Sequence, residues 1–450
     1  MIERTPVIVS KVRSRSDDRD FNLSMDQIRK TKSDVINSFR LKSWNQFKNT
    51  PIPTTKEEAW RRTDLRPMKV DRFKLASSTD PGMTSNIPLN LLKPVADGEH
   101  GGQVIIHGNK VQSKIDPLLV EKGVIFTDLL TAESQYQNFV EKIIGKIVEP
   151  SEGKFAALVG AFAQNGVFLY VPKNVKITTP LHSLIWGATI DMANVSHVMV
   201  FLEEGSSVTY VHEVASETES IGQSFQASNI EMYVGPHAQL NFVELQSWGR
   251  HVWNFTHERV HVDRDGKLDW IFGAIGGHLT KNFAELDLIA SGAIGKMSGF
   301  YFTDADQHLD YDSQQNHMAP HTTSDLLFKG ALVEQSRSVW QGMIYVAPGA
   351  DKTDGYQANR NLLLSKSARA DSIPGLEILA DDVRCTHGAT VGKIDAEQIF
   401  YLMARGIPRI DAERLIVEGF FDPIMQRIPF EGLKERFQQS ISEKMGSYTG

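Results

Sequence analysis

A strand–turn–strand pattern repeats along the middle of this 450-residue chain and restricts the available folds more than any other feature. Each copy has two short segments in which apolar residues alternate with others, joined by a turn that contains glycine. The turn glycines of four successive copies are Gly205, Gly235, Gly266 and Gly292, at spacings of 30, 31 and 26 residues. An earlier copy without a glycine begins at Val167.

A period this even predicts a β-solenoid, in which each coil buries its inward side chains against the next coil. Glycine at the corners supplies backbone angles that other residues adopt only at a cost. A flat β-sandwich is the alternative fold, but sandwiches rarely repeat so evenly. The predicted fold class is therefore mainly β, a parallel solenoid with α-helical regions at both ends.

The periodicity divides the chain into three regions. Residues 1–98 form an N-terminal helical region, with a helix expected within residues 22–48 and a short one starting near Thr54. Residues 99–392 form the solenoid core, where the period is two. Residues 393–450 form a C-terminal helical region.

Three short helices, each apolar on one side, are expected in the C-terminal region. They begin near Asp395, Asp411 and Phe430, and the second should break near Asp422 and Pro423. We expect them to dock on the end of the solenoid, on a partner, or on both.

Composition limits the function. The chain has 48 basic and 55 acidic residues, a net charge of −7, which argues against non-specific nucleic-acid binding. No apolar run reaches the roughly 18 residues of a membrane-spanning helix, and a single cysteine excludes a disulfide framework. We expect a cytoplasmic protein, with an organellar leader in the basic, serine-containing start (Lys11 to Arg19) as the alternative.

The common catalytic motifs are absent from the sequence. It has no Walker A loop, no Gly-x-Ser-x-Gly elbow and no His-Glu-x-x-His pair, so we expect neither P-loop ATPase activity nor another enzymatic activity. The glycines from Gly273 to Gly277 lie in a strand repeat and are interpreted as a packing corner. The densest group of histidines and aspartates (His308, His317 and His321, with Asp304, Asp306, Asp310 and Asp312) is interpreted as solvated surface rather than a metal site.

Cys385, the only cysteine, lies two residues before His387, just before the pattern becomes helical. On an extended strand, side chains two apart point to the same side, so the thiol and imidazole can approach one point. Two ligands cannot complete a four-coordinate metal site. Either the pair is structural, or another chain completes the site, with Glu377, Asp381 and Asp382 nearby as oxygen ligands or supporting groups.

The stretch from Asn361 to Gly392, which contains Cys-Thr-His-Gly, resembles the signature of the SufB/SufD family of iron–sulfur cluster assembly proteins. Thr322 to Gly330 resembles the family's central motif, and the tail from Ala404 to Phe420 is also similar. Glu57 to Leu65, together with the absence of further cysteines, is similar to the SufD branch in particular.

The resemblance implies a right-handed parallel β-helix and a scaffold subunit without ATPase activity of its own. It implies pairing with a SufB-type paralogue, or with a second copy, and binding of a SufC-type ABC ATPase through the C-terminal helices. It also implies that His387, with Cys385 beside it, helps to hold a transient iron–sulfur cluster shared with the partner. No nucleic acid or membrane partner is expected.

Other functions remain open from the sequence. The chain could be a SufB-like primary cluster scaffold, or an interaction module in which Cys385 is inert. A β-helix enzyme acting on polysaccharides would need paired carboxylates in a groove. The sequence offers only scattered acids, with no evident pair (Glu231, Glu244, Asp269 and Glu285).

Overall fold

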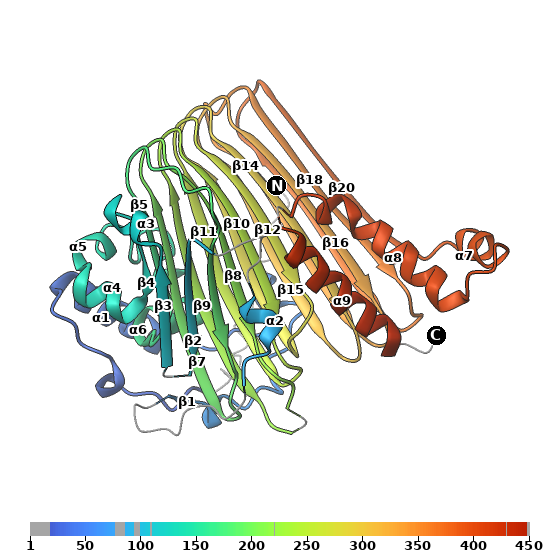
Figure 1. Ribbon diagram of the computed structural model, residues 1–450, viewed down its shortest axis with the longest axis horizontal. Helices are drawn as coiled ribbons and strands as arrows, with labels where there is room; N and C mark the ends of the chain where they lie inside the picture. The colour runs from blue at the N-terminus through green and yellow to red at the C-terminus, as the bar shows by residue number, and fades with distance from the viewer. Residues whose placement is uncertain are drawn as a thin grey trace, which may run out of the picture.

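The computed structural model describes residues 19–76, 86–93, 100–108, 110–219, 221–428 and 430–447. Within these ranges the chain forms two ten-stranded sheets, and from β5 onward successive strands alternate between them (Figure 1). The result is a parallel β-solenoid, which confirms the predicted fold class. All but the last residue of the segment from Lys11 to Arg19 lies outside the described residues.

Sheet A and sheet B are named by their strands. Sheet A runs in the order β19 (Arg369–Ile378), β17 (Arg337–Val346), β15 (His308–His317), β13 (Leu279–Leu288), β11 (Val252–Val262), β9 (Ser224–Val234), β7 (Met192–Leu202), β5 (Val167–Val171) and β4 (Ile125–Asp128), with β1 (Lys74–Leu75) paired to β7. Sheet B runs in the order β20 (Val383–Lys393), β18 (Thr353–Leu363), β16 (Thr323–Leu332), β14 (Ile294–Thr303), β12 (Lys267–Ala274), β10 (Gln239–Ser247), β8 (Ser207–Ala215), β6 (Leu181–Trp186), β2 (Gly102–His107) and β3 (Lys110–Ile115). The coils therefore continue past Gly292 to the end of β20.

Glycines with left-handed backbone angles were expected at the corners between strands, and only some corners have them. Gly205 and Gly292 adopt left-handed angles, with φ of 67° and 77°. At the corners of Gly235 and Gly266 the left-handed residue is instead a neighbour, His237 or Asp265, with φ of 55° and 53°. A Cβ on Gly235 would lie 2.7 Å from the carbonyl oxygen of Leu202 in the preceding coil, so close packing explains that glycine.

Helices before and between the first strands cover the outer face of sheet A (Figure 1). They are α1 (Asp34–Asn49), α4 (Leu129–Gln135), α5 (Gln137–Val140) and α6 (Lys154–Phe162), with 3-10 turns η1 (Met25–Gln27), η2 (Glu58–Trp60), η3 (Val70–Arg72) and η4 (Pro150–Glu152). Two short helices lie elsewhere: α2 (Leu89–Leu92) packs on β6 and β8 of sheet B, and α3 (Pro117–Glu121) places Leu119 in the lumen core. The helix predicted within residues 22–48 begins only at Asp34, where Ser33 caps it by accepting from the Ile36 amide. The one predicted near Thr54 is a single 3-10 turn.

Buried charges fasten this cover to sheet A. The carboxylate of Glu231 accepts hydrogen bonds from the backbone amides of Gly145, Ile147 and Val148 and from His197. A buried carboxylate is costly unless hydrogen-bond donors surround it. The loop that carries these amides is therefore held in one position against β9.

Three C-terminal helices follow the last strand: α7 (Ala396–Met403), α8 (Arg409–Met425) and α9 (Glu431–Ser447). Asp395 caps α7 as expected, its side chain accepting from the Glu397 amide. The second helix ends close to the predicted break: α8 includes Pro423 and ends two residues later, at Met425. Pro423 has no N–H to donate to the carbonyl of Gly419, so the last turn lacks one helical hydrogen bond.

The helices α8 and α9 lie across the outer face of sheet B rather than on the end of the solenoid (Figure 1). Their apolar side chains pack on the outward residues of β10, β12, β14 and β16. Charged contacts add orientation: Arg427 pairs with Asp269 at 2.6 Å, and Lys444 with Asp304 at 2.8 Å. Among the described helices, none is long and apolar enough to cross a membrane.

Between the sheets lies the lumen, filled in its central coils by aromatic rings. Tyr311 contacts Phe272, Tyr301 and Phe328, with ring centroids 5.0, 5.8 and 5.9 Å apart. Gly330 makes room for the Tyr301 ring, whose hydroxyl donates to Asn361 at 2.6 Å. These rings form a layer across the lumen.

We expect Gly330→Ala to destabilise the protein, because the added Cβ would lie 2.1 Å from Cε2 of Tyr301. Overpacking of this kind costs about 1–3 kcal/mol of unfolding free energy. Chemical denaturation measures it. The control is Gly419→Ala at an exposed position of α8, where no atom lies within 4 Å of the added Cβ. Equal stability of the two variants would contradict the packing role of Gly330.

Candidate functional site

The solenoid ends in two unpaired strands. β19 pairs only with β17, and β20 only with β18, so the outer edges of both strands have no partner among the described residues. An unpaired edge presents a row of free N–H and C=O groups that can pair with another chain. This open end carries the residues that the sequence singled out.

The opposite end of the solenoid finishes in protected edge strands. There each sheet finishes with an antiparallel strand, β3 beside β2 and β4 beside β5. β3 bears exposed charged side chains, including Lys110, and β4 has only four residues. Short or charged edge strands resist further pairing. The two ends are therefore unlike.

Cys385 and His387 both lie on β20 and face the lumen. In register they neighbour Gly355 and Gln357 of β18. The side chain of Gln357 crosses the lumen and donates to the backbone carbonyl of Gly375 on β19 at 2.9 Å. Because side chains of paired strands alternate together, Cys385 and His387 point the same way as Gln357.

The thiol of Cys385 is half-buried behind the mouth of the lumen. A Cβ on Gly355 would lie 3.2 Å from Cys385 Sγ and 3.3 Å from Nε2 of His317, so both atoms border the space that this glycine leaves. Burial raises the pKa of the Cys385 thiol, and the nearby Asp354 carboxylate adds to the increase. The thiol is thus protonated near neutral pH.

His387 is exposed beside it, and the acids named from sequence lie apart. Glu377 is exposed on β19, Asp381 is exposed in the following turn, and Asp382 pairs with Lys352. Across the described residues, no group of three or more His, Cys, Asp or Glu side chains is arranged to hold a metal ion. One thiol and one imidazole fit half of a four-coordinate site.

The interpretation of the histidine and aspartate group as solvated surface is only partly right: Asp306 and His321 are exposed, but other members are buried. His317 and Asp310 are fully buried, and Asp304 nearly so. His317 contacts Thr322 and Ser324 at 2.7 and 2.8 Å, and Asp310 pairs with Lys281 at 2.9 Å. Asp310 and His317 lie on opposite faces of β15. His317 faces the lumen and Asp310 faces the helical cover, so both side chains are buried.

The scattered acids are engaged within the fold. Asp269 pairs with Arg427, Glu231 with His197, and Glu285 with Arg259. None of these four acids pairs with another of the four. Glu244 instead has its carboxyl group in hydrogen-bonding contact with that of Glu258, an acid that the sequence did not single out. That pair is buried inside the lumen, not in a surface groove where a polysaccharide could bind.

A second exposed feature is the apolar face of α7 and the start of α8. Phe400 is 72% exposed and Tyr401 55%, and Met403, Ile410 and Leu415 are exposed with them. α7 extends away from the solenoid (Figure 1), and its packing partner is α8. Apolar side chains gathered on one protruding element are typical of a protein interface.

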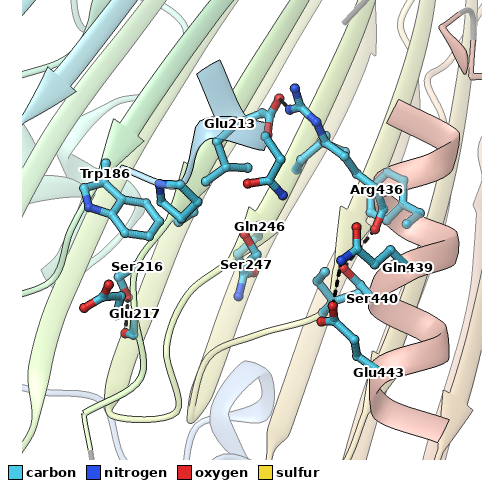
Figure 2. Close-up of a pocket in the computed structure, with 17 residues that line it drawn as sticks. Trp186, Glu213, Ser216, Glu217, Gln246, Ser247, Arg436, Gln439, Ser440 and Glu443 are labelled. Carbon is cyan, nitrogen blue, oxygen red and sulfur yellow. Dashed lines mark hydrogen bonds and ion pairs between the residues drawn. The ribbon is translucent and has the colours of Figure 1, made fainter. Parts of the chain in front are cut away.

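A groove of about 320 Å³ lies between α9 and the outer face of sheet B. Figure 2 shows Arg436 of α9 pointing toward Glu213 of β8, with Nη1 and Oε1 2.5 Å apart. Leu245 and Phe437 supply apolar lining. The ion pair adds a third charged link between the C-terminal helices and sheet B.

Known protein families match both parts of the chain. The domain described as "SufBD protein N-terminal region" matches residues 19–182, and "SUF system FeS cluster assembly, SufBD core domain" matches residues 185–420. Fold and matches together define a β-solenoid component of the SUF system of iron–sulfur cluster assembly. The chain belongs to the SufBD family.

Individual relatives agree. The iron–sulfur cluster assembly protein SufD of Bacillus subtilis (strain 168) is 30% identical over 418 residues, which is 91% of this chain and 94% of that protein. SufBD family proteins of Staphylococcus epidermidis (strain ATCC 12228) and Staphylococcus aureus (strain NCTC 8325) are each 30% identical over 324 residues, 71% of this chain and 69% of those proteins. The predicted family and its resemblance to SufD are confirmed.

Residues that the sequence did not single out border the mouth of the lumen. Gln357 and Gly355 lie in register with the pair, and His317 was wrongly assigned to the surface. If the predicted period-two alternation had been extended through β18, it would have placed Gln357 beside His387.

We expect Asp354→Asn to speed alkylation of Cys385. Removing the carboxylate lowers the pKa of the thiol, so more thiolate is present at a fixed pH. Asp354 is exposed, so we expect about a twofold rate increase near pH 8. Mass spectrometry of maleimide labelling measures the rate, with Asp325→Asn one strand further in as the control. An unchanged rate would contradict the influence of Asp354.

Proposed function

We propose that this chain is a scaffold subunit for iron–sulfur cluster assembly, working in the cytoplasm without catalysis of its own. It pairs through the open end with a SufB-type paralogue and binds a SufC-type ATPase through its C-terminal helices. The observation that supports this most is the unpaired edge of β19 and β20 with Cys385 and His387 at its mouth.

The open end suits pairing with another chain. β19 and β20 have ten and eleven residues, and exposed apolar side chains lie along them, among them Leu376, Ile378 and Val391. A related solenoid would continue both sheets and cover these side chains. Both the hydrogen-bonding groups and the apolar residues then gain partners.

In the paired complex the cluster is the cargo. His387 contributes an imidazole ligand, Cys385 lies beside it, and the partner contributes the thiolates that this chain lacks. A chain with one cysteine is poorly suited to act as the SufB-like primary scaffold. Two copies of this chain would together supply only two cysteines, which favours the paralogue over the homodimer.

The ATPase-binding surface is the exposed apolar face of α7 and the start of α8. Since α8 and α9 are fixed on sheet B, movement of a protein bound to α7 would be transmitted to the solenoid. ATP binding would thereby shift the two scaffold chains relative to each other and alter access to the cluster at their contact.

We expect His387→Ala combined with Cys385→Ala to lower cluster retention at least about tenfold, because losing groups that only support a metal ligand already costs that much. The complex is reconstituted with SufB-type and SufC-type chains and analysed for iron and acid-labile sulfide. Thr386→Ala, exposed on the opposite face of the same strand, is the control. An unchanged cluster yield in the double variant would rule out this site.

We expect Phe400→Asp to weaken binding of the SufC-type ATPase by about 2 kcal/mol or more, as for a central aromatic residue of an interface. Calorimetric titration measures the affinity. The matched control is Leu118→Asp, which alters a 62% exposed apolar residue on α3. Equal affinities of the two variants would place the ATPase elsewhere.

A further inference from the structure

Two carboxyl groups meet inside the solenoid, away from the open end. Glu244 lies on β10 and Glu258 on β11, which belong to opposite sheets. They are 4% and 1% exposed. Glu244 alternates with Leu240 and Phe242, which belong to the lumen core, whereas its neighbours Val243 and Leu245 face the C-terminal helices. Both acids therefore point into the lumen.

The two carboxyl groups lie within hydrogen-bonding contact of each other. The Asn282 amide donates to Oε1 of Glu258 at 2.5 Å. The Oε2 atoms of both acids find no hydrogen-bond donor among the described residues, and neither acid forms an ion pair there. Two carboxyl oxygens that both carry lone pairs repel each other. They come within hydrogen-bonding contact only if a proton or a cation lies between them.

The titratable groups around the pair do not supply a positive charge. His212 neighbours Glu244 in register on β8, but burial lowers its pKa to about 3, so it is neutral. Its Nδ1 contacts Ser183 at 2.8 Å. The other facing groups are the phenols Tyr210 and Tyr311, and burial raises the pKa of each. A neutral surrounding cannot compensate two buried negative charges.

We propose that Glu244 and Glu258 hold one proton between them at neutral pH and form a proton-binding site closed inside the solenoid. One carboxylic acid donates to one carboxylate, so a single charge remains to be stabilised by Asn282. The aromatic layer of Phe272, Tyr301, Tyr311 and Phe328 fills the lumen coils next to the pair, on the side of the open end. The aromatic layer thus separates the pair from Cys385 and His387.

The bound proton couples stability to pH. Burial raises the pKa of Glu244 from 4.5 to about 7 and that of Glu258 well above its ordinary value. Between pH 4.5 and about 7 both carboxyl groups are protonated in the folded chain and ionised in the unfolded chain, and as pH rises past about 7 the pair loses one proton and keeps the other. The pair's contribution is therefore complete below pH 4.5 and declines as pH rises through this window.

The test compares Glu244→Gln and Glu258→Gln with wild type by denaturant unfolding at pH values from 5 to 7, where the wild type holds two protons on the pair and each variant holds one on its remaining acid. As pH rises, the unfolding equilibrium constant of the wild type should increase about tenfold more per pH unit than that of either variant, because the wild type releases one more proton on unfolding. Exposed Glu121→Gln is the control and should follow the wild type. Parallel pH profiles of wild type and both variants would overturn the proposal.

Infrared spectroscopy of the wild type keeps the test valid if a variant fails to fold. A protonated carboxyl stretch should persist in the folded protein at pH 7 and disappear on unfolding. Its absence would overturn the proposal. Native mass spectrometry after incubation with Ca²⁺ or Mg²⁺ gives the other decisive outcome, because a stoichiometric cation that abolishes the stretch would replace the proton as the ligand.

Discussion

Parallel backbone pairing in strict register connects every other part of the molecule. Each strand from β7 to β20 pairs residue by residue with the strand one coil away, so a lumen position in one coil stacks on the same position in the next. A slip of one residue would turn lumen side chains outward. The same register that aligns the aromatic layer therefore places Cys385 and His387 on the lumen side of the last coil.

The two sheets are covered by different means, and the covers leave one end free. Sheet A is covered by the helices around the first strands, fixed by buried ions such as Glu231. Sheet B is covered by α8 and α9, fixed by apolar packing and by Arg427, Arg436 and Lys444. With both faces occupied, new contacts are left to the edges of β19 and β20 and to α7.

The sequence was sufficient for the architecture because alternation and even spacing follow directly from solenoid geometry. It placed Cys385 and His387 on one strand for the same reason. The core was predicted to reach residue 392, but individual repeats were traced only to Gly292, because strands such as β15 place His317 and Gln315 in the lumen and these polar residues interrupt the apolar alternation. The contact of Glu244 with Glu258 depends on two sheets meeting, which spacing along the chain does not reveal.

The unlike ends of the solenoid have a consequence for the size of any assembly. A sheet with two free edges can add chains indefinitely and grow into a fibre. Here the edge strands β3 and β4 are charged or short and resist pairing, and the edges of β19 and β20 lie together at the other end. Two such solenoids that join at their open ends would leave only the protected edges of β3 and β4 uncovered. Such a pair would present no long edge to which a third chain could add by strand pairing.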